Sequence, residues 1–320
     1  MNKAADCWVL TTGEAGMVSQ ATGLAAALGV TFETRTVDLR RPWRWLPGHW
    51  QYRVLNGLTP DSDPVVPPWP ELLIACGRRS TGIAIAIQRS SGGKTFTVYI
   101  QDPQIPARYF DLVVAPAHDH LSGDNVITSR GAINHINADV LAQARAQWSA
   151  VFAALPRPLV AVLIGGSNRH ARMSTSMITQ LITQLRTLSG QGAGLAITTS
   201  RRTGSASTAL LQEGFANRDG CYFWDGNGEN PYKGLLACAD HILVTGDSVS
   251  MVSEACSTGK PVQVIDLANY GKRLQRFHAD LRAAGITRPF SGKLEQWSYP
   301  ALNEAEKAAR HIQNLLATKQ

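Results

Sequence analysis

The residues best suited to bind a ligand lie in the stretch 240–267. Residues 242–245 form a β-branched apolar run that is typical of a buried parallel strand, and Gly246 and Asp247 end it. Ser248 is a favourable N-cap for the helix that follows. Because a helix N-terminus presents unpaired backbone N–H groups and the positive end of the helix dipole, this turn predicts an anion site.

Glu254 extends this anion site toward a nucleotide. Ser250 and Glu254 are four residues apart, so they share one face of the predicted helix. An exposed carboxylate one turn into such a helix can accept hydrogen bonds from both hydroxyls of a ribose while the N-terminus holds phosphate. The alternative is a solvated helix residue without a ligand. The small turn residues, the Ser-x-x-x-Glu spacing and the following Gly-Lys-Pro favour a nucleotide site with contacts from Asp247, Ser248, Ser250 and Glu254.

Two further loops of the same half carry groups suited to a diphosphate. A predicted strand at 159–164 leads into Gly165-Gly166-Ser167, and a second at 195–199 leads to Arg201 and Arg202. Glycine has no Cβ, so the first turn lets a diphosphate approach backbone N–H groups. Guanidinium groups donate in pairs to phosphate oxygens. The alternatives are a glycine turn needed only for packing and one arginine of the pair that faces solvent.

Three side chains in loops of the first half are candidates for a catalytic base: Glu14, His118 and Asp119. Each follows a predicted strand, and histidine has an ordinary pKa of about 6.5, close to what general base catalysis requires. The alternative is that the histidine is a satisfied surface residue. His118 and His120 flank Asp119, but no further ligand accompanies them, so no metal site is predicted.

The elements that must position these loops alternate between strands and helices twice along the chain, as in parallel doubly wound sheets. Polar loops after successive strands then share one edge of each sheet, where such folds bind ligands. We therefore expect an α/β protein of two Rossmann-like domains facing across a cleft, residues 1–155 and residues 156–299. The predicted strands are 7–11, 31–37, 72–76, 96–100, 112–115, 126–127, 159–164, 195–199, 221–224, 242–245 and 262–265.

The composition is that of a two-domain globular protein with an anionic partner. The chain has 320 residues, enough for two cores, and a formal net charge of +7. No apolar run reaches the ~18 residues of a membrane span, and the first residues lack the apolar core of a signal peptide. The five cysteines have no CxxC spacing, and we expect free thiols in a reducing, cytoplasmic compartment.

Residues 39–55 combine arginines with aromatic rings. These side chains are Arg40, Arg41, Arg44, Arg53, Trp43, Trp45, Trp50 and Tyr52. Such a pattern suits a membrane interface or stacked bases. The alternative is a long connection whose tryptophans hold it against the core. We expect an anionic membrane surface as the partner of residues 40–52, no nucleic acid partner, and a protein peripheral to the inner membrane.

Ordered motifs extend along nearly the whole chain. They are 13–20 (GEAGMVSQ), 76–80 (CGRRS), 101–103 (QDP), 110–119 (FDLVVAPAHD), 200–203 (SRRT), 230–232 (NPY) and 245–262 (TGDSVSMVSEACSTGKPV). In this order they resemble the mitochondrial-fission-protein-like family of bacteria and plants, whose members are sometimes labelled nucleoside-diphosphate-sugar epimerases. Residues 162–170 (VLIGGSNRH) are also similar to the Gly-Gly-Ser loop of a GT-B glycosyltransferase. The loop Gly13-Glu14-Ala15-Gly16 departs from the family pattern Gly-Lys-Pro-Gly-His, which removes a lysine and a histidine.

This resemblance implies a GT-B-type, inverting and metal-independent glycosyltransferase, with a nucleoside diphosphate sugar as donor substrate and no further cofactor. The second half would hold the donor, and Asp119, His118 or Glu14 would deprotonate the hydroxyl of a membrane-associated acceptor. Arg201 would neutralise the departing diphosphate. A C-terminal helix within 300–320 would pack back onto the first domain.

Two other functions compete with this interpretation. One is a non-catalytic GT-B-like scaffold in membrane or envelope organisation, for which the aromatic and basic segment would be the working surface. The other is an NAD-dependent nucleotide-sugar epimerase. The sequence disfavours the epimerase because it contains neither a GxGxxG fingerprint nor a Tyr-x-x-x-Lys pair.

Overall fold

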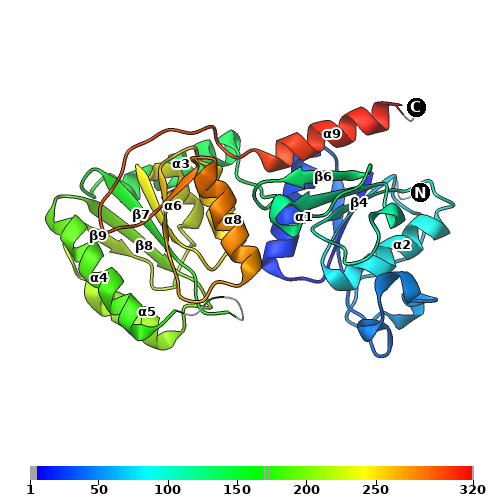
Figure 1. The fold of residues 1–320 in the computed structure, drawn as a ribbon, viewed down its shortest axis with the longest axis horizontal. Helices are drawn as coiled ribbons and strands as arrows, with labels where there is room; N and C mark the ends of the chain where they lie inside the picture. The colour runs from blue at the N-terminus through cyan, green and yellow to red at the C-terminus, as the bar shows by residue number, and fades with distance from the viewer. Residues whose placement is uncertain (1–5, 169–170, 172, 319–320) are drawn as a thin grey trace. The chain divides into compact units, whose positions relative to one another are not determined.

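Two parallel β-sheets, one in each half of the chain, organise the structure (Figure 1). The computed structural model describes residues 6–168, 171 and 173–318. The chain divides into two units, Met1–His135 together with Asn303–Gln320, and Ile136–Leu302. Within the described residues, no helix is both long enough and apolar enough to cross a bilayer.

The first unit contains a six-stranded sheet in the order β2-β1-β3-β4-β5-β6, in which every neighbouring pair is parallel. Its strands are β1 Cys7–Thr11, β2 Phe32–Thr36, β3 Leu72–Cys76, β4 Phe96–Ile100, β5 Leu112–Pro116 and β6 Val126–Ser129. The four central strands are buried along their whole length, because other elements cover both faces of the sheet.

Helices α1 (Ala15–Leu28) and α9 (Glu304–Thr318) cover one face of this sheet, and α2 (Thr81–Ser90) covers the other. Leu24 of α1 and Ile312 of α9 belong to one buried cluster. The last helix of the chain therefore belongs to the first unit. The short 3₁₀ turns of this unit are η1 Trp43–Trp45, η2 Gly48–Trp50, η3 Val54–Gly57, η4 Arg78–Ser80, η5 Ala107–Tyr109 and η6 Ala117–Asp119.

The second unit repeats the architecture with a parallel sheet in the order β12-β11-β10-β7-β8-β9. Its strands are β7 Leu159–Ile164, β8 Gly194–Thr199, β9 Cys221–Phe223, β10 His241–Thr245, β11 Val262–Ile265 and β12 Thr287–Pro289. Its helices are α3 Ala138–Phe152, α4 Thr175–Gly190, α5 Ser205–Phe215, α6 Tyr232–Cys238, α7 Val249–Cys256 and α8 Lys272–Ala283.

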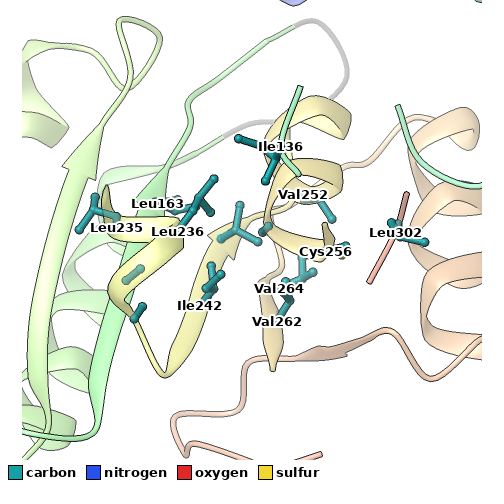
Figure 2. Close-up of a cluster of buried hydrophobic side chains, with 14 of the residues drawn as sticks. Ile136, Leu163, Leu235, Leu236, Ile242, Val252, Cys256, Val262, Val264 and Leu302 are labelled. Carbon is teal, nitrogen blue, oxygen red and sulfur yellow. The ribbon is translucent and has the colours of Figure 1, made fainter. Parts of the chain in front are cut away.

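The core of the second unit lies on both faces of its sheet. On one face, drawn in Figure 2, Leu163 of β7 and Ile242 of β10 belong to the same cluster as Val252 of α7 and Leu236 of α6. The helices α4 and α5 supply the cluster on the opposite face. Burial on both faces explains why these strands are apolar runs rather than alternating ones.

The division between the units lies before α3, whereas the sequence placed residues 138–152 in the first domain. Helix α3 packs on α6, because Gly234 leaves room for the ring of Trp148, which a Cβ at that position would overlap. Trp148 also stacks on Phe152, with 5.8 Å between ring centroids. A contact with an element some 80 residues further along the chain, rather than the local pattern, assigns this helix to its unit.

Candidate functional site

Asp247 joins the turns that follow the neighbouring strands β7 and β10. Gly166 N donates to Asp247 Oδ2 at 3.1 Å, and the Thr245 hydroxyl donates to Asp247 Oδ1 at 2.7 Å. Thr245 Oγ1 in turn accepts from Gly165 N at 2.7 Å. The Asp247 side chain is fully buried. A buried carboxylate needs such donors, so this one holds both turns in a fixed arrangement.

The two glycines of the β7 turn are required by close packing. A Cβ on Gly165 would overlap the Asp247 carboxylate, and a Cβ on Gly166 would overlap the backbone carbonyl of Arg202. A main-chain carbonyl cannot rotate away as a flexible side chain can. From the sequence, the backbone N–H groups of this turn were expected to bind a diphosphate. In the structure, Gly165 N donates to the Thr245 hydroxyl and Gly166 N donates to the Asp247 carboxylate instead.

The turn after β8 carries two exposed arginines, and one of them reaches Asp247. Arg202 NH2 lies 3.1 Å from Asp247 Oδ2. Thr203 Oγ1 donates to Gly165 O at 2.5 Å and so ties this turn to the turn after β7. The side chain of Arg201 is exposed. Among the described residues, no carboxylate lies within ion-pair distance of Arg201, which leaves its guanidinium available to an anion.

Ser248 caps α7, as the sequence predicts. Its hydroxyl accepts from Met251 N at 3.4 Å, while its backbone is extended. Ser250 lies half-buried in the first turn of the same helix. The start of α7 therefore adjoins the turn that Asp247 anchors, and its dipole favours negative charge there.

The rest of the β7 loop is organised by its own polar side chains. Ser167 Oγ accepts from Met173 N at 3.0 Å, and Asn168 Nδ2 donates to Asp247 O at 3.1 Å. Ser167 itself is exposed. Residues 169–170, which end the compared segment 162–170, lie outside the described residues.

Glu254 is buried, which corrects the expectation of an exposed side chain on α7. It is 8% exposed, and the Tyr232 hydroxyl donates to its Oε2 at 2.6 Å. Burial raises the pKa of Glu254, against the opposing effects of the Tyr232 hydrogen bond and the charge of Lys233. Burial together with the adjacent carboxylate raises the pKa of Tyr232 well above its ordinary value. Within the described part of the chain no hydrogen bond reaches Glu254 Oε1.

His278 and Tyr270 also contact the turn after β10, and the sequence did not predict this pair. His278 Nε2 lies 2.7 Å from Gly246 O, and Tyr270 accepts a hydrogen bond from Leu267 N at 2.9 Å. Burial lowers the pKa of His278, so the neutral ring donates to the carbonyl near neutral pH. A Cβ on Gly246 would overlap the Tyr270 hydroxyl. The available signal was the apolar periodicity of α8, which carries His278.

Glu14, a predicted catalytic base, is held by an ion pair in the first unit. Arg79 NH2 lies 2.9 Å from Glu14 Oε1, and Arg79 NH1 lies 2.7 Å from Asp38 Oδ1. The Thr12 hydroxyl also donates to Glu14. The carboxylate thus connects the loops that follow β1 and β3.

His118 and Asp119, the other predicted bases, lie together in η6 after β5. His118 is buried, and its Nε2 is 3.7 Å from Asp119 Oδ1. Two strands separate β5 from β1, so the sheet places this pair apart from Glu14. All three candidates belong to the first unit, and all the predicted donor contacts belong to the second. In the part of the chain that the structure describes, no three His, Cys, Asp or Glu side chains form a metal site.

Two parallel six-stranded sheets, one in each unit, define a GT-B-like α/β protein. Solved structures share this fold. UDP-GlcNAc 2-epimerase from Methanocaldococcus jannaschii matches with a TM-score of 0.58 and 10% identity over 97% of this chain and 99% of that chain. A MnaA–UDP structure from S. aureus matches with a TM-score of 0.53 and 12% identity, over 97% of this chain and 88% of that chain. UDP-GlcNAc 2-epimerase from Neisseria meningitidis, bound to UDP-GlcNAc, matches with a TM-score of 0.52 and 12% identity, over 98% of this chain and 92% of that chain.

The chain belongs to the mitochondrial fission ELM1 family, whose model matches residues 15–316. It is 34% identical over 276 residues to mitochondrial fission protein ELM1 of Arabidopsis thaliana, covering 78% of this chain and 65% of that protein. It is 27% identical over 347 residues to uncharacterized protein RP120 of Rickettsia prowazekii (strain Madrid E), covering 95% and 97%. The predicted family and the predicted GT-B-like fold class are both confirmed.

Proposed function

We propose that the second unit binds a nucleoside diphosphate sugar at the carboxyl edge of its sheet, and that the protein is a GT-B-type glycosyltransferase. The observation that carries the proposal is that hydrogen bonds join the turns after β7, β8 and β10, so that the turn with Arg201 adjoins the one that leads into α7, the helix of Glu254. Similar folds described with UDP or UDP-GlcNAc support a uridine nucleotide as the first ligand to test.

Each group has a role set by its chemistry. Ser248, Ser250 and the backbone at the start of α7 would receive the diphosphate, which the helix dipole stabilises. Glu254 Oε1 would accept from the ribose, while Tyr232 fixes the other oxygen. Arg201 would neutralise the charge that grows on the departing diphosphate. In this scheme arginine and helix N-terminus supply the electrostatic stabilisation, without a metal ion.

The transfer step requires a base in the first unit. Asp119, His118 or Glu14 would take the proton from the acceptor hydroxyl as its oxygen attacks the anomeric carbon. The bond from that carbon to the diphosphate breaks, and attack from the opposite face inverts the configuration. The Thr12 hydroxyl and Arg79 already engage the carboxylate of Glu14, and His118 Nε2 lies 3.7 Å from Asp119 Oδ1.

We place the acceptor at a membrane surface and the protein at the cytoplasmic face of the inner membrane. The same donor site would also serve a non-catalytic GT-B-like scaffold that binds nucleotide as a regulator. The engaged Glu14 and the fission role in the relative's name favour this second candidate. Product analysis after incubation with UDP-GlcNAc and membrane extract separates transfer from binding alone.

Calorimetry with UDP, uridine and UDP-GlcNAc tests the donor site. We expect UDP to bind more tightly than uridine, because the diphosphate contacts Arg201 and the start of α7. Arg201→Gln should lower the affinity for UDP by about tenfold, since a hydrogen bond to a charged group contributes about 1.5–3 kcal/mol. The affinity for uridine, which has no phosphate, should stay unchanged. Arg218→Gln, at another exposed arginine of the second unit, is the matched control. Absence of UDP binding at millimolar concentration would end the proposal.

A further inference from the structure

We propose that residues 40–53, here called the Arg/Trp surface, dock the first unit onto an anionic lipid bilayer. The proposal does not depend on the donor site, which lies in the second unit. It rests on side chains whose orientation the sequence alone left open.

One tryptophan of the Arg/Trp surface turns inward and holds the segment in place. Trp43 Nε1 donates to Tyr52 O at 2.9 Å, and the indole fills the space that a Cβ on Gly57 would need. Gln51 Nε2 donates to Trp43 O at 2.8 Å and to Leu46 O at 3.0 Å. The 3₁₀ turns η1 to η3 are therefore a fixed platform rather than a loose connection.

The other rings of the Arg/Trp surface point outward. Trp45 is 63% exposed, Trp50 is 67% exposed and Tyr52 is 77% exposed. Leu46, between the two tryptophans in sequence, is 38% exposed. Large apolar side chains gathered on one exposed segment mark an interaction surface. Trp and Tyr rings are favoured at the depth of lipid head groups, where one end of the ring is apolar and the other wet.

The charge of the Arg/Trp surface identifies its partner as anionic. Residues 40–53 contain four arginines and neither aspartate nor glutamate. The Arg41 guanidinium lies 4.5 Å from the centre of the Trp45 ring, and that of Arg53 lies 5.3 Å from the Tyr52 ring. Each exposed ring of these two pairs therefore carries a positive charge beside it. A bilayer with anionic head groups matches both parts of this pattern.

A groove beside the platform offers room for a head group. It has a volume of about 470 Å³ and is lined by residues 48–56 and by α2. Arg53 and Arg89 are among its lining residues, together with Trp50 and Tyr52. Two guanidinium groups suit a lipid phosphate, and the adjacent rings suit the apolar part that follows it.

A single nucleic acid strand is the competing partner, because it also combines phosphates with stacking groups. Arginine already covers one face of the Trp45 and Tyr52 rings. Leu46 has no face on which a base could stack. These two features favour the bilayer.

Sedimentation with phosphatidylglycerol–phosphatidylcholine vesicles tests the proposal with the full chain. We expect binding that weakens with salt, since exposed charges are screened within about 10 Å at 0.1 M. Vesicles of phosphatidylcholine alone should bind far less. Trp45→Ala/Trp50→Ala should lose about tenfold in affinity per ring, and Arg41→Gln/Arg53→Gln about thirtyfold in total.

Matched controls change the same kind of side chain elsewhere. Phe32→Ala removes an exposed ring of the same unit, and Lys272→Gln/Arg276→Gln removes two exposed charges from α8. These variants should bind vesicles like the wild type, and all variants should keep its thermal midpoint. Glycerol phosphate should not displace the vesicles. It carries the phosphate of a lipid head group but offers no apolar layer into which the exposed rings could insert.

Four results would overturn the proposal: no binding of the wild type to anionic vesicles, equal binding to neutral ones, equal losses in the α8 control, or displacement of the vesicles by a single-stranded oligonucleotide. The last result would assign the surface to nucleic acid. Each is independent of the calorimetry that tests the donor site, so the two proposals fail separately.

Discussion

Replacing Glu254 by glutamine separates its role in ligand binding from its role in packing. The amide keeps the size of the side chain and an oxygen for the Tyr232 hydroxyl, which lies 2.6 Å from Oε2. It removes the charge that a ribose hydroxyl would meet at Oε1. A hydrogen bond to a charged group contributes about 1.5–3 kcal/mol, so nucleoside diphosphate affinity should fall about tenfold to a hundredfold.

The same substitution should change how stability depends on pH. Burial raises the pKa of Glu254 above its ordinary value of 4.5. Between 4.5 and the raised value, the native protein keeps a proton that the unfolded chain has lost. The free energy of unfolding contributed by this group therefore falls as pH rises through that window, and is unaffected below it. Glu254→Gln has no such titration, so it gains stability relative to the wild type as pH rises.

Tyr232→Phe tests the other half of the pair. It leaves the carboxylate buried without its donor, which should cost about 1.5–3 kcal/mol of unfolding free energy at neutral pH. Glu213→Gln, at an exposed carboxylate of the same unit, should change neither affinity nor stability.

Calorimetry and urea unfolding on both sides of the pH window measure these effects. If Glu254 contacts the ribose, removing the 2′-hydroxyl of the nucleotide should lower its affinity for the wild type by the same factor as Glu254→Gln does. Removing that hydroxyl should lower the affinity for Glu254→Gln only slightly further. An unchanged nucleotide affinity combined with the changed pH slope would refute the ligand role. Glu254 would then serve only to tie α6 to α7.

Two further predictions concern packing. Gly166→Ala should lower the free energy of unfolding, measured with urea, by about 1–3 kcal/mol, because the new Cβ would overlap the Arg202 carbonyl. Gly190→Ala is the control and should not destabilise the protein, because a Cβ there meets nothing within 4 Å. Native alkylation followed by peptide mapping should modify Cys221 first, since the other four thiols are buried; modification of Cys256 at an equal rate would contradict the buried core around α7.

The sequence predicts the central strands well because they are apolar runs buried on both faces, as in residues 159–164 and 242–245. It misses α8 and β12, although Leu274, Phe277 and Leu281 have the spacing of a buried helix face. The signal was present, but the helix is so rich in charged residues that its apolar face is narrow.

The candidate site was less predictable because its contacts join distant parts of the chain. The position of Glu254 one turn into α7 follows from local spacing, but its burial depends on Tyr232, 22 residues away. Trp43 and Trp45 are two residues apart, yet one is half-buried and the other exposed. No regular period exists in short 3₁₀ turns, so composition alone cannot tell which ring faces inward.

The return of the chain after Leu302 has a consequence for biosynthesis. The second unit, Ile136–Leu302, is continuous, whereas the first is completed only by Asn303–Gln320. Ala308, Ala309 and Ile312 of α9 complete the core against α1, so the ribosome must make the whole second unit before that core can close. Of the two units, the one that begins earlier in the chain is thus completed later, and until α9 emerges it exposes the apolar face of α1 to chaperones and to other nascent chains.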